Sequence, residues 1–270
     1  MTSALSPHWR VMEPLIAACA PRMLLEVGVF AGDTTTLLLD YAARHQAVVH
    51  AVDTVIRPEL EELAERHGDR LVLHRGPSLT ELPRVGPVDV AILDGDHNWY
   101  TVLHELRILR ESAASAGRAL PLIFLHDIGW PYGRRDQYHD PEAIPAADRH
   151  PHRMAGIVPG ETQLSETAGI AGQIHNAEVE GGPRNGVLTG VEDFLSETPV
   201  ELTLYTVTGF HGLGILVSGA ALAANEDLRA ALAELDSPTS LEEQCRVLEE
   251  ARVEMQAKAA TLRRRLRGSA

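Results

Sequence analysis

The chain contains few of the residues on which several kinds of site depend. Its only two cysteines, Cys19 and Cys245, lie far apart and outside any Cys-x-x-Cys or zinc-binding pattern, so we expect reduced thiols. Lys258 is the only lysine and lies in a polar tail, which argues against a Schiff base or a lysine-anchored cofactor. We therefore expect neither a disulfide-stabilised fold nor lysine-based catalysis.

Long apolar runs and a general excess of basic residues are also missing. No run approaches the ~18 apolar residues of a membrane span, and no charged-then-apolar signal segment opens the chain, so we expect a cytoplasmic protein without membrane contact. The net charge of −14 argues against nucleic acid as a partner. The exception is the tail from Arg252 to Arg267, whose basic residues are typical of a solvated helix face.

What the chain does contain is a buried strand that runs into a glycine-bearing turn and a helix start, LLEVGVFAGDT at residues 24–34. In α/β proteins such a junction holds nucleotide-like ligands, because backbone N–H groups converge there. In a dinucleotide turn, Gly-x-Gly-x-x-Gly, the middle glycine lets the backbone approach a pyrophosphate. Here Gly28 and Gly32 flank Phe30 at that middle position. The turn therefore indicates a nucleoside without phosphates rather than a nicotinamide dinucleotide; alternatively, the two glycines serve only packing.

Acidic residues end the next strands of the pattern. Asp53 follows the strand VVHAV and is placed to accept hydrogen bonds from two ribose hydroxyls. Asp94 follows the strand VDVAIL. In this order, over residues 22–128 and weakly over 200–218, the motifs resemble the class I methyltransferases that depend on S-adenosylmethionine (SAM). The resemblance implies SAM as the cofactor and assigns its contacts to Glu26, Gly28, Phe30, Gly32, Thr34, Asp53, Ser78 and Asp94.

Strands alternate with helices along the first half of the chain, which predicts a Rossmann-like α/β fold. We expect a mostly parallel seven-stranded sheet with helices on both faces, closed by a hairpin as in the methyltransferase sheet. The expected strands are residues 22–29, 47–53, 70–75, 88–94, 119–126, 200–207 and 212–217. The expected helices are residues 8–19, a helix from 33–34 onward, 57–67, 78–83 and 98–113.

The pattern predicts a methyltransferase domain over residues 1–218 and a helical extension over 219–270. Residues 128–191 form a long insertion after the fifth strand, too long for a structureless loop. Because the insertion starts at a strand end, a substrate lid is favoured over an inert segment. In the extension, Ser240 and Glu243 predict a capping box at the start of a long helix. That helix packs on the body or pairs across a homodimer or higher homo-oligomer through one apolar stripe: Leu241, Cys245, Leu248, Ala251, Met255, Ala259, Leu262 and Leu266.

Asp94, His126 and Asp127 end two strands that are expected neighbours in the sheet. This arrangement resembles the metal-dependent O-methyltransferases of natural-product sugars, the macrocin O-methyltransferase and cephalosporin-hydroxylase-like group. In that group an aspartate ends the fourth strand and an acidic pair ends the fifth. The resemblance implies a divalent cation, Mg²⁺ or Mn²⁺, at these three residues, and a glycosylated small-molecule acceptor. His126 departs from the acidic pair, and imidazole favours Mn²⁺, Fe²⁺ or Zn²⁺ over Mg²⁺.

Methyl transfer to oxygen needs a base that removes the hydroxyl proton. The resemblance offers His97 and Asp96 for this role, and imidazole suits a base at neutral pH. The alternative for His97 is a helix N-terminal residue bonded to backbone. Aromatic residues make up only 4% of the chain, yet several follow the acidic strand ends. Trp99 fits the apolar face of its helix and is expected in the core, whereas substrate contacts are expected from Trp130, Tyr132 and Arg134.

These patterns predict an O-methyltransferase that transfers the SAM methyl group to a hydroxyl of a small-molecule natural product, with metal or base assistance. Two alternatives stay open: a non-catalytic assembly partner with the same fold, and a metal-dependent hydrolase built on the acidic cluster. SAM binding separates the hydrolase from the other two. Methyl transfer to a vicinal diol separates the enzyme from the binding protein.

Overall fold

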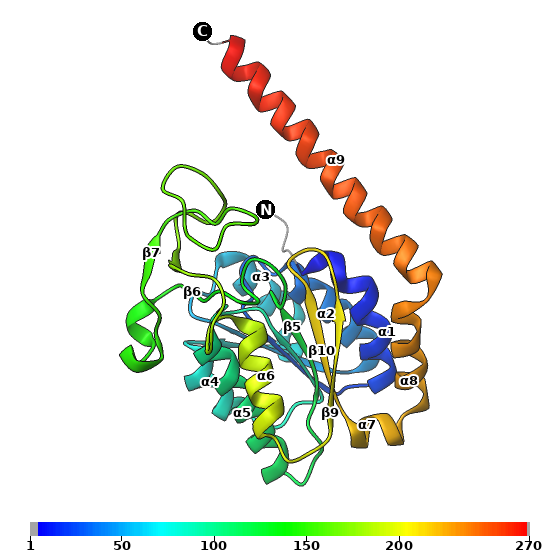
Figure 1. Ribbon diagram of the computed structural model, residues 1–270. Helices are drawn as coiled ribbons and strands as arrows, with labels where there is room; N and C mark the ends of the chain where they lie inside the picture. The colour runs from blue at the N-terminus through cyan, green and yellow to red at the C-terminus, as the bar shows by residue number, and fades with distance from the viewer. Residues whose placement is uncertain (1–4, 269–270) are drawn as a thin grey trace.

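A seven-stranded sheet forms the centre of the molecule (Figure 1). The computed structural model describes residues 5–268. In sheet order, the strands are β3 (Leu71–Arg75), β2 (Val48–Asp53), β1 (Met23–Val27), β4 (Val90–Leu93), β5 (Leu122–His126), β10 (Leu213–Ser218) and β9 (Leu202–Val207). The first five are parallel, and β10 runs antiparallel to both of its neighbours. The predicted Rossmann-like sheet of seven mostly parallel strands is therefore confirmed.

Helices cover both faces of the sheet. One hydrophobic core lies under α1 (Trp9–Cys19), α2 (Asp33–His45), α3 (Pro58–His67) and α8 (Glu226–Ala233). The other lies under α4 (Ser78–Val85), α5 (Trp99–Ser115) and α6 (Val187–Glu197). Successive side chains of a strand point to opposite faces, so on β1 Leu24 belongs to the first core and Leu25 to the second. Because both faces of the sheet are buried under helices, the central strands are mostly continuous apolar runs in the sequence.

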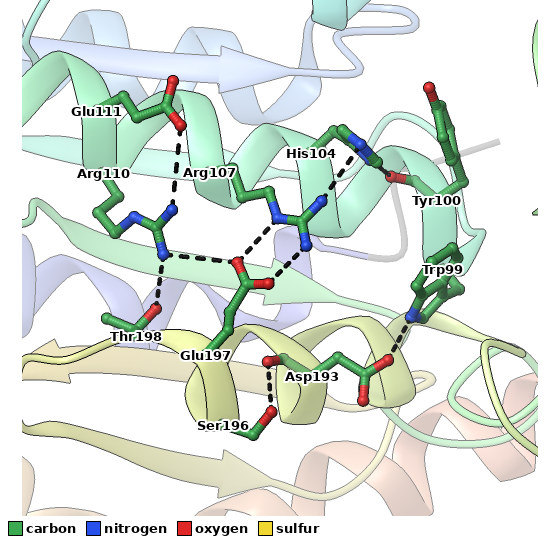
Figure 2. Close-up of polar contacts among 10 residues, drawn as sticks. All are labelled: Trp99, Tyr100, His104, Arg107, Arg110, Glu111, Asp193, Ser196, Glu197 and Thr198. Carbon is green, nitrogen blue, oxygen red and sulfur yellow. Dashed lines mark hydrogen bonds and ion pairs between the residues drawn. The ribbon is translucent and has the colours of Figure 1, made fainter.

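Polar contacts fix α5 against α6 (Figure 2). Arg107 donates to both carboxylate oxygens of Glu197, at 2.8 and 2.5 Å. The indole of Trp99 donates to Asp193 at 2.7 Å, and its side chain is buried, as expected of a core residue. The start of α5 is thereby held in place directly after Asp96 and His97.

The parallel register brings the carboxyl ends of the central strands to one edge. Val27 of β1 lies beside Val52 of β2 and Leu93 of β4. Gly28 follows with a φ of +83°, and a Cβ there would lie only 2.1 Å from the carbonyl oxygen of Asp94. Only glycine allows this conformation and this approach. The turn after β1 therefore packs directly on the strand end that carries Asp94.

The insertion after β5 is folded. It carries a three-stranded sheet, β6 (Gln137–Tyr138), β8 (His175–Ala177) and β7 (His152–Met154). The buried carboxylate of Asp136 anchors it, accepting the N–H groups of Trp99 at 2.7 Å and Gly186 at 2.6 Å and the hydroxyl of Tyr138 at 2.8 Å. Helix α6 begins at Val187, so the last residues of the predicted lid segment belong to a helix that covers the sheet.

The chain continues after β10 through α7 (Gly219–Ala224) and α8 into α9 (Pro238–Gly268), a long helix that projects from the body (Figure 1). The predicted capping box at Ser240 and Glu243 is wrong. The helix starts earlier because Pro238 suits the first helical position, and the hydroxyl of Ser237 accepts the Ser240 N–H at 3.1 Å. The short 3₁₀ helices are η1 (Ser6–His8), η2 (Gly68–Arg70), η3 (Pro141–Ala143), η4 (Ala146–Asp148) and η5 (Glu234–Asp236). Within residues 5–268, no helix is long and apolar enough to cross a membrane.

Candidate functional site

The turn between β1 and α2 is held by the carboxylate at the end of β2. Oδ2 of Asp53 accepts the N–H groups of Val29 at 2.9 Å and Phe30 at 3.1 Å, and Oδ1 accepts that of Val55 at 3.0 Å. Phe30 has a φ of +47° and is 47% exposed, with the guanidinium of Arg57 over its ring at 4.4 Å. The predicted cofactor residues Gly28, Phe30 and Asp53 thus lie together at the carboxyl edge of the sheet. Arg57, which the sequence analysis did not predict, lies beside them.

Three further predicted cofactor residues lie beneath or beside this turn. Glu26 is buried in β1, and the hydroxyl of Thr35 donates to its Oε2 at 2.6 Å. Burial raises the pKa of Glu26 to about 8, and the nearby Asp94 and Asp53 add to this effect. Thr34 is buried in the first turn of α2 behind Gly32. These residues support the turn from within the core.

Ser78, another predicted cofactor residue, begins α4. Its side chain forms a hydrogen bond with the carboxyl of Glu105, a residue of α5 that the sequence analysis did not single out. Burial raises the pKa of Glu105 to about 8, although this hydrogen bond opposes the shift. Which of these residues contact SAM stays a prediction.

An acidic cluster with one imidazole lies at the ends of β4 and β5, as the sequence predicts. Nδ1 of His126 lies 2.8 Å from Oδ1 of Asp94 and 3.0 Å from Oδ2 of Asp127. One donor atom from each of the three residues lies within 4.8 Å of the other two. Asp127 has a φ of +60°, a conformation that is costly for a residue with a side chain and that recurs at functional sites.

Electrostatics in this cluster favour a positive charge between the carboxylates. Burial opposes the charged ring, but Asp94 and Asp127 outweigh it and raise the pKa of His126 well above its usual value. Burial likewise opposes ionisation of Asp127, but His97 and His126 lower the pKa of that carboxyl to about 2. The protonated Nδ1 of His126 thus lies between the carboxylates of Asp94 and Asp127.

The same donor set fits a divalent cation. Nε2 of His126 lies 2.8 Å from the carbonyl oxygen of Phe210, which can only accept, so Nε2 carries a proton. When the ring is neutral, Nδ1 therefore has the free lone pair, and it faces both carboxylates. In metal sites, a hydrogen bond from the other ring nitrogen fixes the orientation of a ligating histidine in this way. Oδ1 of Asp127 is buried and has no hydrogen-bond partner among the described residues. A cation between the carboxylates would replace the proton on Nδ1.

The predicted base lies against the same cluster. Nδ1 of His97 lies 3.2 Å from Oδ2 of Asp127, and its ring stacks on Tyr132 with the centroids 5.5 Å apart. The backbone carbonyl of His97 accepts the N–H of Gln137 at 3.0 Å, so the insertion touches the site here. Asp96 is directed to α5 instead, where it accepts the Thr101 hydroxyl at 3.2 Å.

The three predicted substrate residues are placed differently from one another. Tyr132 is buried against His97, and Trp130 is 36% exposed in the same loop. Arg134 is engaged by α6, where its guanidinium donates to both oxygens of Glu192 at 2.6 Å. The structure therefore brings Tyr132, but not Arg134, to the candidate base.

A cavity of about 290 Å³ lies between the body of the protein and α9. It lies between η1, the loop from β9 to β10 and the first turns of α9, and its lining includes His8, Val11, Phe210, Val247 and Leu248. The ring of His8 meets those of His126 and Phe210 edge to face, with centroids 6.0 and 5.9 Å apart. Sequence reasoning missed His8 and Phe210, because a buried N-terminal ring and a backbone carbonyl carry no motif.

Comparisons with known proteins agree with this geometry. Residues 25–128 match the family model Methyltransf_24, described as a methyltransferase domain. No curated protein matches the chain. A methyltransferase of Podospora anserina solved with S-adenosylhomocysteine has a similar fold, with 14% identity and a TM-score of 0.50 over 81% of this chain and 80% of that one. An O-methyltransferase of Bacillus cereus is 15% identical over 79% and 81% of the two chains, with a TM-score of 0.46. TomG of Streptomyces achromogenes, also an O-methyltransferase, is 14% identical over 79% and 80%, with a TM-score of 0.47.

Residues 25–128 therefore match a methyltransferase domain in sequence, and the chain has the fold of the class I methyltransferases. The matched segment runs from β1 through the end of β5, and it includes the turn after β1, Asp53, and the cluster of Asp94, His126 and Asp127. The predicted resemblance is confirmed at the level of this class.

Proposed function

We propose that this protein is an O-methyltransferase that uses SAM to methylate a hydroxyl of a small-molecule natural product, with a divalent cation at the acidic cluster. The observation that carries the proposal is the meeting of Asp94, His126 and Asp127 with His97 beside the turn after β1. The turn after β1 would form the nucleoside edge, which binds the nucleoside of SAM, and the acidic cluster would form the oxygen-binding edge, which binds the acceptor. These two parts lie next to each other at the ends of neighbouring strands.

At the nucleoside edge, Asp53 would accept hydrogen bonds from the ribose while it holds the turn N–H groups of Val29 and Phe30. The packing of Gly28 on Asp94 keeps this turn close to the acceptor side. SAM supplies an electrophilic methyl group on a sulfonium. With SAM held at the turn, the methyl group would lie beside the end of β4.

At the oxygen-binding edge, Asp94, His126 and Asp127 would hold the cation. A bound divalent cation lowers the pKa of an acceptor hydroxyl and orients a vicinal diol. His97 then takes the hydroxyl proton on Nε2, because Asp127 faces its Nδ1 and holds the ring. The acceptor oxygen forms its bond to the methyl carbon as the carbon–sulfur bond breaks, which leaves a methyl ether and S-adenosylhomocysteine.

A glycosylated acceptor fits the surroundings of this edge. The sugar diol would lie over the acidic cluster, with Tyr132 and the half-exposed Trp130 beside it. The cavity beside α9, with Val11, Phe210 and Leu248 in its wall, would offer space for an apolar aglycone.

The decisive experiment combines SAM calorimetry with a methyl-transfer assay on glycosides that carry vicinal hydroxyls. Wild-type protein should bind SAM and transfer its methyl group, whereas Asp94→Asn should bind SAM within a few-fold and lose turnover. Asp40→Asn on the outer side of α2 is a matched control that should keep both properties. Binding of SAM without transfer to any diol would favour a non-catalytic role. Absence of SAM binding would overturn the proposal.

A further inference from the structure

Helix α9 has an apolar face that the body of the protein leaves uncovered over most of its length. The helix has 31 residues and projects beyond the sheet and its helical layers (Figure 1). At 1.5 Å per residue it is about 46 Å long. Leu241, Met255 and Leu262 are 47%, 71% and 59% exposed. Among the described residues, its first three turns meet the body, where Leu248 lies against Gly209.

Apolar residues recur along α9 with the spacing of a coiled coil, and of these Leu248 is half-buried against the body. Leu241, Leu248, Met255 and Leu262 are seven residues apart, and Cys245, Arg252, Ala259 and Leu266 lie between them at alternating steps of four and three. This spacing keeps one seam on one side of the helix and matches the a and d positions of a heptad. Arg252 is the one charged residue in the seam.

Charge divides α9 into two halves of opposite sign. Residues 242–254 contain five glutamates and two arginines, whereas residues 255–267 contain five basic residues and no acidic one. Within the helix, Arg246 pairs with Glu250 and Arg252 with Glu249 in the acidic half, and Lys258 pairs with Glu254 across the boundary between the halves. The two halves are therefore complementary to each other in a second copy turned end to end.

We infer that α9 pairs with α9 of a second copy of this chain as an antiparallel two-helix coiled coil. In that register Cys245 meets Leu262 of the partner subunit, Ala259 meets Leu248 of the partner subunit, and Arg252 meets Met255 of the partner subunit. Glu242 then faces Arg263 of the partner subunit beside the seam. A parallel pair would instead place Lys258 opposite Arg263 of the partner subunit, and charges next to the seam select orientation.

Partner choice follows from the same pattern. The seam fits a second copy because Leu248 meets Ala259 of the partner subunit, Leu262 meets Cys245 of the partner subunit, and Glu242 meets Arg263 of the partner subunit beside the seam. The pairing does not involve Asp94, His126 or His97, and one seam residue, Leu248, also lines the cavity beside α9. Failure of the pairing would leave the proposed function untouched.

Light scattering and sedimentation of the full chain test the association. The 29.4 kDa chain should form a dimer at about 50 μM, with a concentration-dependent mass. Met255→Glu combined with Leu262→Glu should weaken the dimer by at least ~100-fold, because two charges enter the seam from each copy. Val253→Glu is the matched control, since Val253 is 49% exposed on the same helix but lies outside the seam. It should leave the dimer unchanged.

A disulfide test fixes the orientation. With Cys19→Ala as background, Leu262→Cys should form a covalent dimer through the native Cys245 on oxidation, and adding Cys245→Ser should abolish it. A cross-link that survives Cys245→Ser would indicate a parallel pair and overturn the antiparallel register. A wild-type monomer at about 50 μM, or a dimer that survives the double glutamate variant, would overturn the pairing. A monomer that binds phosphatidylserine vesicles would assign the helix to a membrane surface and overturn it as well.

Discussion

The ring of His126 donates from Nε2 to the carbonyl oxygen of Phe210 across 2.8 Å. This bond joins the end of β5 to the loop between β9 and β10, two segments that are far apart in the sequence. It also decides which ring nitrogen faces Asp94, because a carbonyl oxygen accepts only from the protonated nitrogen. The chemistry of the cluster therefore depends on a backbone group of a distant loop.

Metal binding should compete with a proton at His126. Because Asp94 and Asp127 raise the pKa of the ring well above its usual value, a cation must displace a proton below that pKa. We expect Mn²⁺ affinity to rise by up to about tenfold per pH unit below the pKa of His126, with one proton released per ion. Calorimetry in buffers of different ionisation enthalpy measures this release. His126→Asp should flatten the slope and shift preference toward Mg²⁺, and a pH-independent Mn²⁺ affinity in the wild type would contradict the assignment.

Removal of His97 should affect turnover rather than binding. His97→Ala should lower the methylation rate by about 10²–10⁴-fold, the usual contribution of a positioned base, and leave Mn²⁺ and SAM affinities nearly unchanged. The control Asp96→Asn should have a small effect, because Asp96 faces Thr101 on α5. Single-turnover rates at saturating SAM measure both. A rate within threefold of wild type would assign proton removal to another group.

Truncation of the carboxylate at the end of β2 should weaken SAM binding. Asp53→Ala loses bonds to the ribose and to Val29 and Phe30, and should cost about 1.5–3 kcal/mol of SAM binding free energy. Asp53→Asn, which keeps one acceptor oxygen, should lose less. Titration calorimetry gives both values. Tight NADH binding by the wild type together with no SAM binding would reject the cofactor assignment.

Folding stability should fall as the pH rises past the pKa of Glu26 in the unfolded chain. Burial raises the pKa of Glu26 from 4.5 to about 8. The folded protein therefore keeps a proton that the unfolded chain loses, which costs stability on the order of 3 kcal/mol by pH 7. Glu26→Gln should remove much of this slope in urea unfolding between pH 5 and 8, while the exposed Glu62→Gln should not. An unchanged slope in Glu26→Gln would show that the carboxyl is ionised in the fold.

The insertion should behave as a lid in its outer part and as a fixed element at its root. Residues 159–163 are exposed, whereas Asp136 and Asn185 are buried and hydrogen-bonded at the root. Limited proteolysis should cut the outer part first, and SAM with acceptor should slow the cut at least fivefold. Mass spectrometry of the fragments locates the site. Equal cleavage with and without ligands would favour an inert insertion.

The sequence predicts the parts of this protein that depend on local pattern. Apolar runs that end in Asp53 and Asp94 are strands, since burial on both faces and the following turn are each visible in consecutive residues. The gathering of Asp94, His126 and Asp127 follows from strand order alone. These features needed no knowledge of tertiary contacts.

Other parts of the site depend on contacts that no short pattern encodes. The carbonyl of Phe210 and the buried ring of His8 reach the cluster through the packing of η1 and of the β9–β10 loop. In the sequence, Asp136 looks like any other aspartate of a loop. The structure shows the three groups that donate hydrogen bonds to its carboxylate. The start of α9 was misplaced by three residues, because two serines compete for the cap and Pro238 decides between them.

The two ends of the insertion meet at a narrow neck. Val187 donates to the carbonyl of Tyr132 at 2.9 Å, Leu188 to that of Gly133 at 3.1 Å and Gly181 to that of Arg134 at 2.7 Å. A segment whose entry and exit are paired in this way can be exchanged for another of different length without moving the strands on either side. Chimaeras joined at this neck would therefore exchange the insertion and keep the strand ends that carry Asp53 and Asp94 in place.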